Sequence, residues 1–279
     1  MDLLLIGGVS GSGKSVALAA LEDSGYYTVN NLPLPLLAET AAYLRRAGQA
    51  RVAVSLDVKT EPGLTALPAM IETLRGDGCS VRFLYLDTRT DTLVKRFSET
   101  RRRHPFSTDT RTLIEAIEYE RQLLADVRHL ARVFDTSESS AAALRAWIKD
   151  FISIDATRLT LLFESFGFKH GVPLDADLVF DVRCLPNPFY DPRLRPLTGL
   201  DPGVIAFLDR EPQVGKMLAD VRGFIETWLP AYTHDNRGYL AVAIGCTGGQ
   251  HRSVYIVEKL AAHFEPRMSV VVRHRGLSA

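Results

Sequence analysis

Near the start of the chain, three glycines, a lysine and a serine are spaced for holding the phosphates of a nucleotide. The segment 8–15 reads GVSGSGKS and fits the pattern G-x-x-x-x-G-K-[ST]. Glycines allow the open backbone angles that turn successive N–H groups into one concavity, and a following helix adds its partial positive charge. Lys14 can reach the β- and γ-phosphates and the Ser15 hydroxyl can ligate Mg²⁺, so this pair is predicted to be catalytic. The predicted nucleotide-binding residues of this loop are Gly8, Val9, Ser10, Gly11, Ser12, Gly13, Lys14 and Ser15.

A second loop with phosphate-binding chemistry lies near the end of the sequence. Residues 246–253 read CTGGQHRS and fit C-x-x-G-x-x-R-[ST], between an apolar segment and a helical one. Backbone N–H groups near glycines, a helix N-terminus and an arginine fork together favour a phosphate group. A structural loop and catalysis by a low-pKa Cys246 stay open, although Gly245 stands where protein tyrosine phosphatases usually carry a histidine. The predicted phosphometabolite-binding residues are Cys246, Thr247, Gly248, Gly249, His251, Arg252 and Ser253.

Acidic and basic residues between these loops are candidates for completing the nucleotide site. Asp57 and Asp87 each follow an apolar segment, and either can ligate Mg²⁺ directly or through water. For Asp87, capping of the next helix is an equally good interpretation. The cationic stretch that follows can neutralise transition-state charge, with the Arg101–Arg103 region closing on the nucleotide. Its members are Lys95, Arg96, Arg101, Arg102, Arg103 and His104.

Other interpretations of the charged residues stay open. The cationic stretch is equally consistent with a solvated face balanced by Glu115, Glu118 and Glu120, and RNA contact is a third interpretation. His170 is a candidate for the second phosphate site or a structural histidine. Around a proline-rich loop at 184–203, three arginines can bind an anion or pair with nearby aspartates. They are Arg183, Arg193 and Arg195.

The elements that must position these residues alternate between strand and helix patterns, which is typical of a parallel α/β sheet. In the first half we expect strands at 3–6, 26–29, 52–57, 81–86 and 133–135. Helical patterns of this half cover 15–21, 34–47, 65–74, one long stretch 90–132, and 141–152. In the second half we expect strands at 157–164, 239–244 and 269–273, and helices at 203–208, 214–229 and 254–264. A change in composition near residue 154 predicts two domains, 1–152 and 153–279.

Composition excludes several classes of protein. The formal net charge is 0, so no overall attraction to nucleic acid or to a membrane surface is expected. Hydrophobic residues make up 46% and charged residues 24%, as in ordinary globular proteins. The 3 cysteines are too few for a disulfide framework, and no apolar run approaches the roughly 20 residues of a membrane span. We therefore expect a cytoplasmic protein without a membrane segment.

Taken together, these motifs resemble the bacterial RapZ/YvcJ nucleotide-binding proteins over essentially the whole chain. The C-terminal motifs are the more specific ones, because P-loop proteins at large lack them. The segments that carry the resemblance are 8–15, 31–33 (NLP), 57–58 (DV), 163–171 (FESFGFKHG), 180–183 (FDVR), 185–188 (LPNP), 194–196 (LRP), 198–200 (TGL), 207–208 (FL) and 243–255 (AIGCTGGQHRSVY).

The resemblance implies an α/β fold with a kinase-like P-loop NTPase domain and a second α/β domain, similar to a sugar-phosphate enzyme module, that holds the second phosphate loop. It implies weak hydrolysis of ATP or GTP with Mg²⁺, and a further guanine-nucleotide segment at Asp57, Val58, Lys59 and Thr60. In the enterobacterial branch, the second domain senses glucosamine-6-phosphate and binds a small RNA. There the protein is a homotetrameric RNase E adapter in amino-sugar control, so the resemblance also implies a homo-oligomer.

Three departures from the family pattern bear on these implications. Asn30 replaces the aspartate expected before the NLP motif, which removes one carboxylate. Phe189 stands where the enterobacterial loop has a histidine that helps to hold the sugar phosphate. We expect weak anchoring of RNA, because the lysine-rich tail of the RNA adapters does not follow. The cations near this end are Arg267, Arg273, His274 and Arg275.

We therefore expect a nucleotide-binding regulatory protein with slow hydrolysis and a C-terminal phosphosugar sensor. The alternatives are a kinase that phosphorylates a small molecule, an RNA adapter, and a Cys246-dependent phosphatase. The expected partners are a nucleotide, a phosphosugar such as glucosamine-6-phosphate, a second copy of the chain and, less strongly anchored, a small RNA with RNase E.

Overall fold

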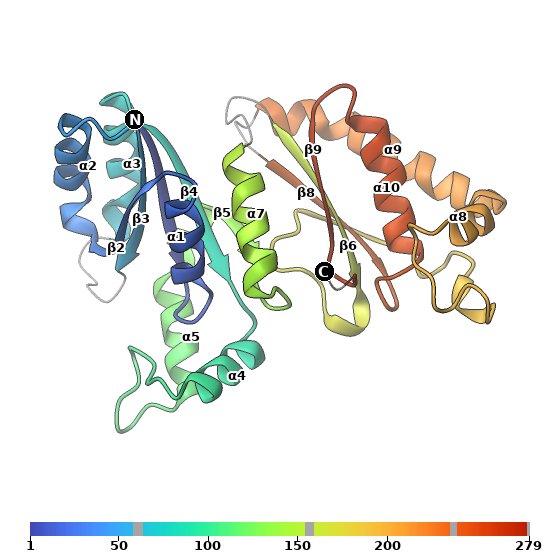
Figure 1. Cartoon of the computed structure of the whole chain (residues 1–279), viewed down its shortest axis with the longest axis horizontal. Coiled ribbons are helices and arrows are strands. Elements are labelled where there is room, and N and C mark those ends of the chain that lie inside the picture. The colour runs from blue at the N-terminus through green and yellow to red at the C-terminus, as the bar shows by residue number, and fades with distance from the viewer. Residues whose placement is uncertain (58–63, 154–158, 235–238, 278–279) are drawn as a thin grey trace. The chain divides into compact units, whose positions relative to one another are not determined.

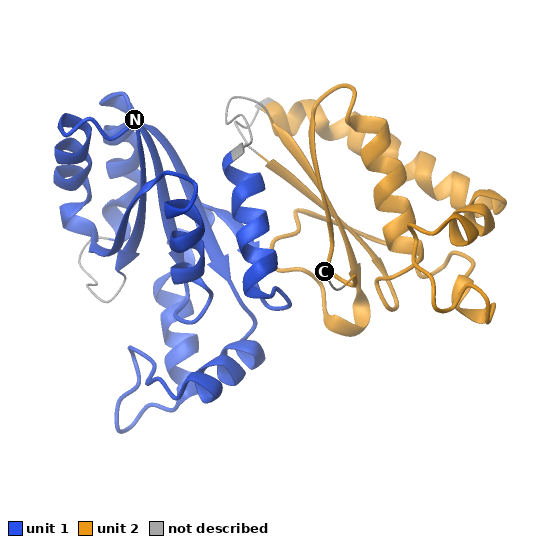
Figure 2. Cartoon of the chain, in the orientation of Figure 1, with its two compact units in different colours: residues 1–153 blue, residues 154–279 orange. Residues whose placement is uncertain are grey.

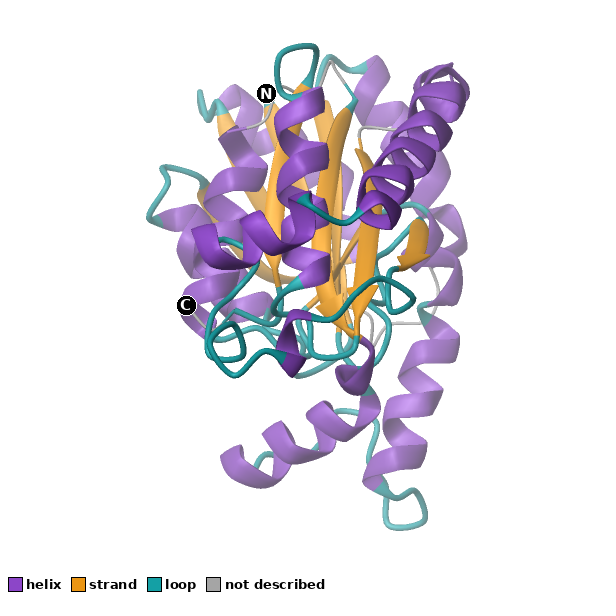
Figure 3. Cartoon of the chain, turned by 90° about the vertical axis from the view of Figure 1, so that its right-hand side faces the viewer, coloured by secondary structure: helices purple, strands orange, loops and turns teal. Residues whose placement is uncertain are grey.

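The computed structural model describes residues 1–57, 64–153, 159–234 and 239–277, and Figure 1 traces their helices and strands. The chain divides into two compact units, Met1–Ser153 and Ile154–Ala279 (Figure 2). In each unit the sheet strands pair in parallel and alternate along the chain with helices (Figure 3). The predicted α/β class is therefore confirmed.

The described part of the first unit contains one parallel sheet with the strand order β2-β3-β1-β4-β5. The central strand β1 buries Leu3–Ile6 completely, as expected for a strand with helices on both faces. Because the carboxyl ends of parallel strands share one edge, the ends of β1, β3 and β4 lie at the edge where α1 begins. The strands are β1 (Asp2–Gly8), β2 (Tyr27–Pro33), β3 (Arg51–Asp57), β4 (Ser80–Asp87) and β5 (Arg132–Asp135).

Helices cover both faces of this sheet. Helices α1 and α7 pack against each other on one face, and α2 and α3 lie on the other (Figure 1). On the second face, Leu37 of α2 and Ile71 of α3 share one core with Leu3 of β1. The helices are α1 (Lys14–Glu22), α2 (Leu37–Arg46), α3 (Leu67–Gly76), α4 (Thr90–Thr100), α5 (Leu113–Leu123), α6 (Ala125–His129) and α7 (Ala141–Ser153), with short 3-10 turns η1 (Leu34–Leu36) and η2 (Leu64–Ala66).

The prediction of one helical stretch over 90–132 is wrong. Helix α4 ends where Arg101 adopts a left-handed conformation with a φ of 52°. Pro105, which has no backbone N–H group, lies in the loop 101–112 that follows. Helix α5 then starts at a capping box, in which the side chain of Thr112 accepts from the N–H of Glu115 and the Glu115 carboxylate accepts from the N–H of Thr112. This loop brings arginines to the edge of the sheet where α1 begins.

The described part of the second unit contains a parallel sheet with the order β7-β8-β6-β9, and helices α8, α9 and α10 lie together on one side of it (Figure 1). The sequence patterns missed β7, because this short edge strand carries no buried stripe. Strand β6 begins at Thr160, and residues 157 and 158 of the expected strand lie outside the described residues. The elements are β6 (Thr160–Gly167), η3 (Phe168–His170), β7 (Leu178–Asp181), η4 (Pro188–Tyr190), α8 (Pro202–Asp209), α9 (Pro212–His234), β8 (Tyr239–Cys246), α10 (Arg252–Phe264) and β9 (Ser269–His274). Among the helices in the described ranges, none is both long and apolar enough to cross a membrane.

Candidate functional site

The loop from Gly8 to Ser15, here called the P-loop, connects β1 to α1 with the backbone geometry of a phosphate cradle. Gly8, Gly11 and Gly13 have φ angles of 135°, 85° and 104°, a region that residues with side chains rarely adopt. At Gly8, a Cβ atom would lie 2.3 Å from the carbonyl oxygen of Leu86 in β4. Ser12 is fully buried, and its hydroxyl has no hydrogen-bond partner in the described part of the chain. The loop therefore offers polar groups at the N-terminus of α1, where anions are favoured.

Lys14 turns back onto the P-loop. Its Nζ atom donates to the carbonyl oxygens of Gly8 at 2.5 Å and Val9 at 3.2 Å. Desolvation lowers the pKa of Lys14, while the carboxylates of Glu120 and Asp57 act in the opposite direction. An ammonium group that has lost water gains most from an anionic partner, which the phosphates of a nucleotide would supply.

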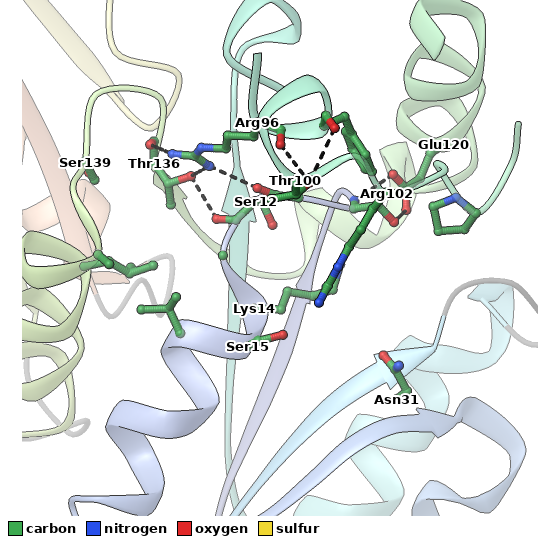
Figure 4. A pocket seen from close by; sticks show the side chains of 18 of the residues that line it. Ser12, Lys14, Ser15, Asn31, Arg96, Thr100, Arg102, Glu120, Thr136 and Ser139 are labelled. Carbon is green, nitrogen blue, oxygen red and sulfur yellow. Dashed lines mark hydrogen bonds between the residues drawn. The ribbon is translucent and has the colours of Figure 1, made fainter. Parts of the chain in front are cut away.

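A cavity of about 550 Å³ lies over the P-loop (Figure 4). Lys14 and Ser15 lie in its middle, with Ser139 at one end and Asn31 at the other (Figure 4). Arg96 and Thr136 lie toward the Ser139 end (Figure 4), and Ser140, Ala141 and Leu144 also line the cavity. The remaining lining includes Leu56, Asp57, Arg102, Arg103, Pro105 and Glu120.

The sheet explains why Asn31 and Asp57 reach the same cavity. Strands β2 and β3 pair in parallel, with Pro33 opposite Asp57 at their carboxyl ends. The register shifts just before, between Val29 and Leu32, and Asn31 has a φ of 52°, which asparagine tolerates better than most residues. Of the second predicted nucleotide segment, Asp57 lines the cavity, whereas Val58, Lys59 and Thr60 lie outside the described residues.

Asp87, the other predicted metal ligand, serves a structural ion pair. Its carboxylate accepts from Nη1 of Arg121 at 2.6 Å and from Nε of Arg128 at 3.0 Å. The residue is 2% exposed and does not line the cavity. The helix-capping interpretation is also incomplete, because the contacts of Asp87 join β4 to α5 and α6. Asp57 is therefore the better placed of the two carboxylates for a metal on the phosphates.

We expect Asp87→Asn to lower stability without changing the response to magnesium. Removing the charge takes away the carboxylate that pairs with two arginines. The loss should be about 2–3 kcal/mol, less than for a fully buried pair, because both arginines reach solvent. Urea unfolding measures the stability, and nucleotide affinity at several Mg²⁺ concentrations measures the metal response. An unchanged unfolding midpoint, or a Mg²⁺ response unlike that of the exposed control Asp91→Asn, would contradict this assignment.

The cationic stretch splits into members that line the cavity and members that do not. Arg96 connects two loops, because it donates to the carbonyl oxygens of Gly11 at 3.0 Å and Thr136 at 2.7 Å. Arg102 and Arg103 line the cavity from the loop 101–112, whereas Arg101 ends α4 and does not. Lys95 is exposed and lies 4.0 Å from Glu99 on its own helix.

Glu120 is the site residue that sequence reasoning missed. We expected it among the counter-charges of a solvated face, but it is 0% exposed and lines the cavity. Burial alone would raise its pKa, but the contacts with His104, Lys14 and Ser10 lower it. A signal was available, since Glu120 lies three and four residues after the buried Ile117 and Ala116, on the apolar stripe of α5.

The second loop surrounds a sulfur atom. The N–H of Gly249 donates to Sγ of Cys246 at 3.2 Å, and the Ser253 hydroxyl lies 3.2 Å from the same atom. Burial would raise the pKa of Cys246, but hydrogen bonds from Ser253 and Gly249 and the charge of Arg252 lower it. A side chain at Gly245 would begin 2.5 Å from the rings of Phe166 and Phe168, so a histidine has no room there.

Arg252 connects this loop to the segment 183–185 by hydrogen bonds. Its Nη1 donates to the carbonyl oxygens of Arg183 at 2.8 Å and Leu185 at 2.9 Å. Its Nη2 donates to the Thr247 hydroxyl at 3.3 Å, while its Nε is buried and has no partner within the described ranges. That remaining N–H group is suited to an anion.

A cavity of about 400 Å³ adjoins Arg252. Of the residues predicted for the second site, Thr247 and Arg252 line it, and Arg183 and Asn187 join them. The remaining predicted residues do not line this cavity, which leaves Cys246 without access to it. They are Cys246, Gly248, Gly249, His251 and Ser253.

Other predicted cations of the second unit are paired with neighbours. His251 places Nε2 3.2 Å from the carbonyl oxygen of Leu194, and His170 does not line the cavity. Arg193 pairs with Asp191 at 2.9 Å. The four cations expected near an RNA also make ion pairs: Arg267 with Glu226, Arg273 and Arg275 with Glu164, and His274 with Glu258.

Comparisons with known proteins match both units. A model described as the RapZ-like N-terminal domain matches residues 1–156, and one described as the RapZ C-terminal domain matches residues 159–278. A "Nucleotide-binding protein" of Thiobacillus denitrificans is 59% identical over 278 residues, which is 100% of both chains. A nucleotide-binding protein of Azoarcus sp. is 59% identical over 277 residues, which is 99% of this chain and 95% of its own.

Solved structures resemble slightly more than half of the chain at low identity. A shikimate kinase from Bacteroides thetaiotaomicron is 13% identical with a TM-score of 0.36, covering 55% of this chain and 99% of its own. A sugar kinase from Janibacter sp. is 20% identical with a TM-score of 0.39, covering 55% of this chain and 95% of its own.

Proposed function

Since this chain belongs to the RapZ family and is a nucleotide-binding protein with a kinase-like P-loop fold, we propose that it is a regulatory protein with two phosphate sites. It binds ATP or GTP with Mg²⁺ at the P-loop and hydrolyses it slowly, and it senses a phosphosugar at the second loop. The observation that carries this proposal is a pair of similar loops. Each unit has a strand, a glycine-containing loop and a helix, with Lys14 or Arg252 beside a cavity.

The nucleotide site has oxygen ligands that suit a magnesium ion. Ser15 is exposed to the cavity at the start of α1, and Asp57 lines the same cavity. Hydroxyl and carboxylate oxygens suit Mg²⁺, which would bridge the phosphates and neutralise their charge. We place the base at the Thr136–Ala141 end and the γ-phosphate near Lys14 and Arg102. Val58, Lys59 and Thr60 remain proposed members of the same site.

The second site would take a phosphosugar such as glucosamine-6-phosphate. Thr247 and Arg252, which line the cavity, would hold the phosphate, and Asn187 and Gln213, which also line it, can bond sugar hydroxyls. Phe189 lies beside this region with Arg195 over its ring at 4.7 Å.

The regulatory role is tested by measuring hydrolysis with and without the phosphosugar. We expect slow, Mg²⁺-dependent release of inorganic phosphate by the full chain, with a rate that glucosamine-6-phosphate changes at least twofold. Each ligand should also raise the thermal stability, by about 2.7 kcal/mol at 100 times its dissociation constant. If the phosphosugar changes neither the hydrolysis rate nor the melting curve, the sensing role is contradicted.

A small-molecule kinase is the second candidate function. The cavity continues past the P-loop to Asn31 and Asp57, which leaves room for an acceptor hydroxyl beside the γ-phosphate. The same assay decides between the two, if the γ-phosphate is radiolabelled. Label that appears on a metabolite identifies a kinase, whereas label that appears only as inorganic phosphate supports hydrolysis.

We propose that the phosphosugar sensor acts through an adapter role toward a small RNA and RNase E, in a homo-oligomer. Arg267, Arg273, His274 and Arg275 are poor anchors for it, because each already has a carboxylate partner. A phosphatase is not proposed, since Cys246 is 3% exposed and does not line the cavity.

A further inference from the structure

We propose that Glu120 and His104 form a positioning pair that holds the loop 101–112 against the P-loop, so that Arg102 reaches the transferred phosphate. The inference rests on the proposed hydrolysis of a nucleotide at the P-loop. It gives Glu120 a role through other residues, because its carboxylate makes its contacts within the protein.

Glu120 joins α5 to the P-loop through two hydrogen bonds and to the loop 101–112 through a third. Its Oε2 accepts from the backbone N–H of Ser10 at 2.7 Å, and its Oε1 accepts from the Ser10 hydroxyl at 2.8 Å. The Nε2 atom of His104 lies 3.2 Å from Oε2. Both oxygens are thus occupied, and the 110-residue separation between Ser10 and Glu120 makes this a long-range tie.

His104 ties the loop 101–112 to the same carboxylate. It is 3% exposed, and its Nδ1 accepts from the backbone N–H of Phe106 at 3.2 Å. With Nδ1 accepting, a neutral imidazole carries its proton on Nε2, which then donates to Glu120. The rings of Phe97 and Phe106 lie 5.0 Å and 6.1 Å from the imidazole and exclude water from it.

The residues just before His104 are the ones that need positioning. Arg102 and Arg103 line the cavity, and the side chain of Arg102 extends toward Lys14 (Figure 4). Among the described residues, Arg103 is otherwise held only by an exposed ion pair with Asp109 at 3.2 Å. Exposed pairs of this kind contribute little, so the buried His104–Glu120 contact is the stronger restraint on the loop.

This arrangement predicts which kinetic constant responds. An arginine over the γ-phosphate acts mainly on charge that develops in the transition state, so its displacement lowers kcat more than it raises KM. A residue that serves only folding would lower the melting temperature and leave both constants of the folded fraction unchanged. The split between kcat and KM therefore separates positioning from simple stability.

The test replaces Glu120 by glutamine in the full chain. The amide has one acceptor oxygen, and its NH₂ group would face a donor of Ser10 or His104. We expect kcat for nucleotide hydrolysis to fall roughly tenfold or more, with KM within about threefold of wild type. Glu118→Gln, on an exposed turn of the same helix, is the matched control and should change neither constant.

A double-mutant cycle with Arg102→Ala decides whether Glu120 acts through this arginine. If it does, Glu120→Gln should add less than twofold to the loss caused by Arg102→Ala. Losses that multiply in the double variant would overturn the proposal. Should Glu120→Gln fold poorly, His104→Ala is expected to give the same kcat loss and the same non-additivity, and a wild-type kcat in that variant would also overturn it.

A readout that needs no hydrolysis keeps this inference separate from the proposed function. Trypsin cleaves after arginine, and Arg101, Arg102 and Arg103 lie in the positioned loop. We expect cleavage there to accelerate at least fivefold in Glu120→Gln relative to Glu118→Gln. Equal cleavage rates would contradict the positioning role, whereas absence of hydrolysis in the wild type with faster cleavage of Glu120→Gln would contradict only the proposed function.

Discussion

Replacing Lys14 by alanine is expected to lower the affinity for a Mg²⁺–nucleotide by about 30-fold or more. Losing one partner of a desolvated, hydrogen-bonded charge pair costs roughly 2–5 kcal/mol, and each 1.4 kcal/mol is a factor of ten. In the structure the ammonium group contacts only backbone oxygens of its own loop among the described residues, at Gly8 and Val9. The variant should therefore fold normally, and titration calorimetry with the nucleotide measures the loss.

Lys95→Ala is the matched control for this variant. Lys95 is exposed on α4 and lies 4.0 Å from Glu99, so its removal should leave nucleotide affinity unchanged. An affinity of Lys14→Ala within threefold of wild type would mean that the P-loop does not hold the phosphates. A similar loss in both lysine variants would instead indicate a general electrostatic effect.

Arg252→Ala is expected to have the second largest effect, because it removes both a structural contact and the anion ligand that we propose. Its guanidinium holds the carbonyl oxygens of Arg183 and Leu185. Hydrogen bonds from a charged donor contribute roughly 1.5–3 kcal/mol each, so unfolding of the second unit should become easier by about 3 kcal/mol. Urea unfolding measures this change. A change below 1 kcal/mol would contradict the structural role.

Arg252→Lys separates binding from stability. A lysine keeps the charge but cannot form the fork that the loop and the phosphate require. We expect this variant to fold and to bind glucosamine-6-phosphate at least tenfold more weakly than wild type. Arg193→Ala removes an exposed arginine from the same unit and should leave binding unchanged. Wild-type affinity in Arg252→Lys would remove this residue from the proposed site.

Sequence patterns correctly predicted the strands and loops in which local composition and tertiary packing favour the same structure. Strand β1 is a continuous apolar segment and is buried on both faces, and the glycines after it adopt the open angles that a phosphate loop needs. The same holds for β8 and α10 around the second loop. In these places short-range composition and long-range packing favour the same structure.

The misassigned stretch 90–132 shows where local patterns fail. Its charged helical composition continues through residues that form a loop, and the break depends on single residues. Arg101 takes a left-handed angle and Thr112 starts a capping box with Glu115. The T-x-x-E spacing of that box was readable in the sequence, whereas no local pattern marks the left-handed angle of Arg101.

The charged site residues were assigned less well than the loops, because their partners are distant in sequence. Asp87 is occupied by Arg121 and Arg128, and Glu120 is occupied by Ser10. Nothing local distinguishes Asp87 from Asp57, which also follows an apolar strand but lines the cavity. At the second loop, the N–H of Gly249 donates to Sγ of Cys246 inside the turn. Of the seven residues predicted there, Thr247 and Arg252 are the two that line the cavity.

The central claim is that one chain carries two separate phosphate sites, and calorimetric titration of three proteins tests it most directly. Wild type, Lys14→Ala and Arg252→Lys are each titrated with Mg²⁺–nucleotide and with glucosamine-6-phosphate. We expect wild type to bind both, Lys14→Ala to lose the nucleotide and keep the phosphosugar, and Arg252→Lys to show the reverse. Loss of both ligands in either folded variant, or no phosphosugar binding by wild type, would contradict the account.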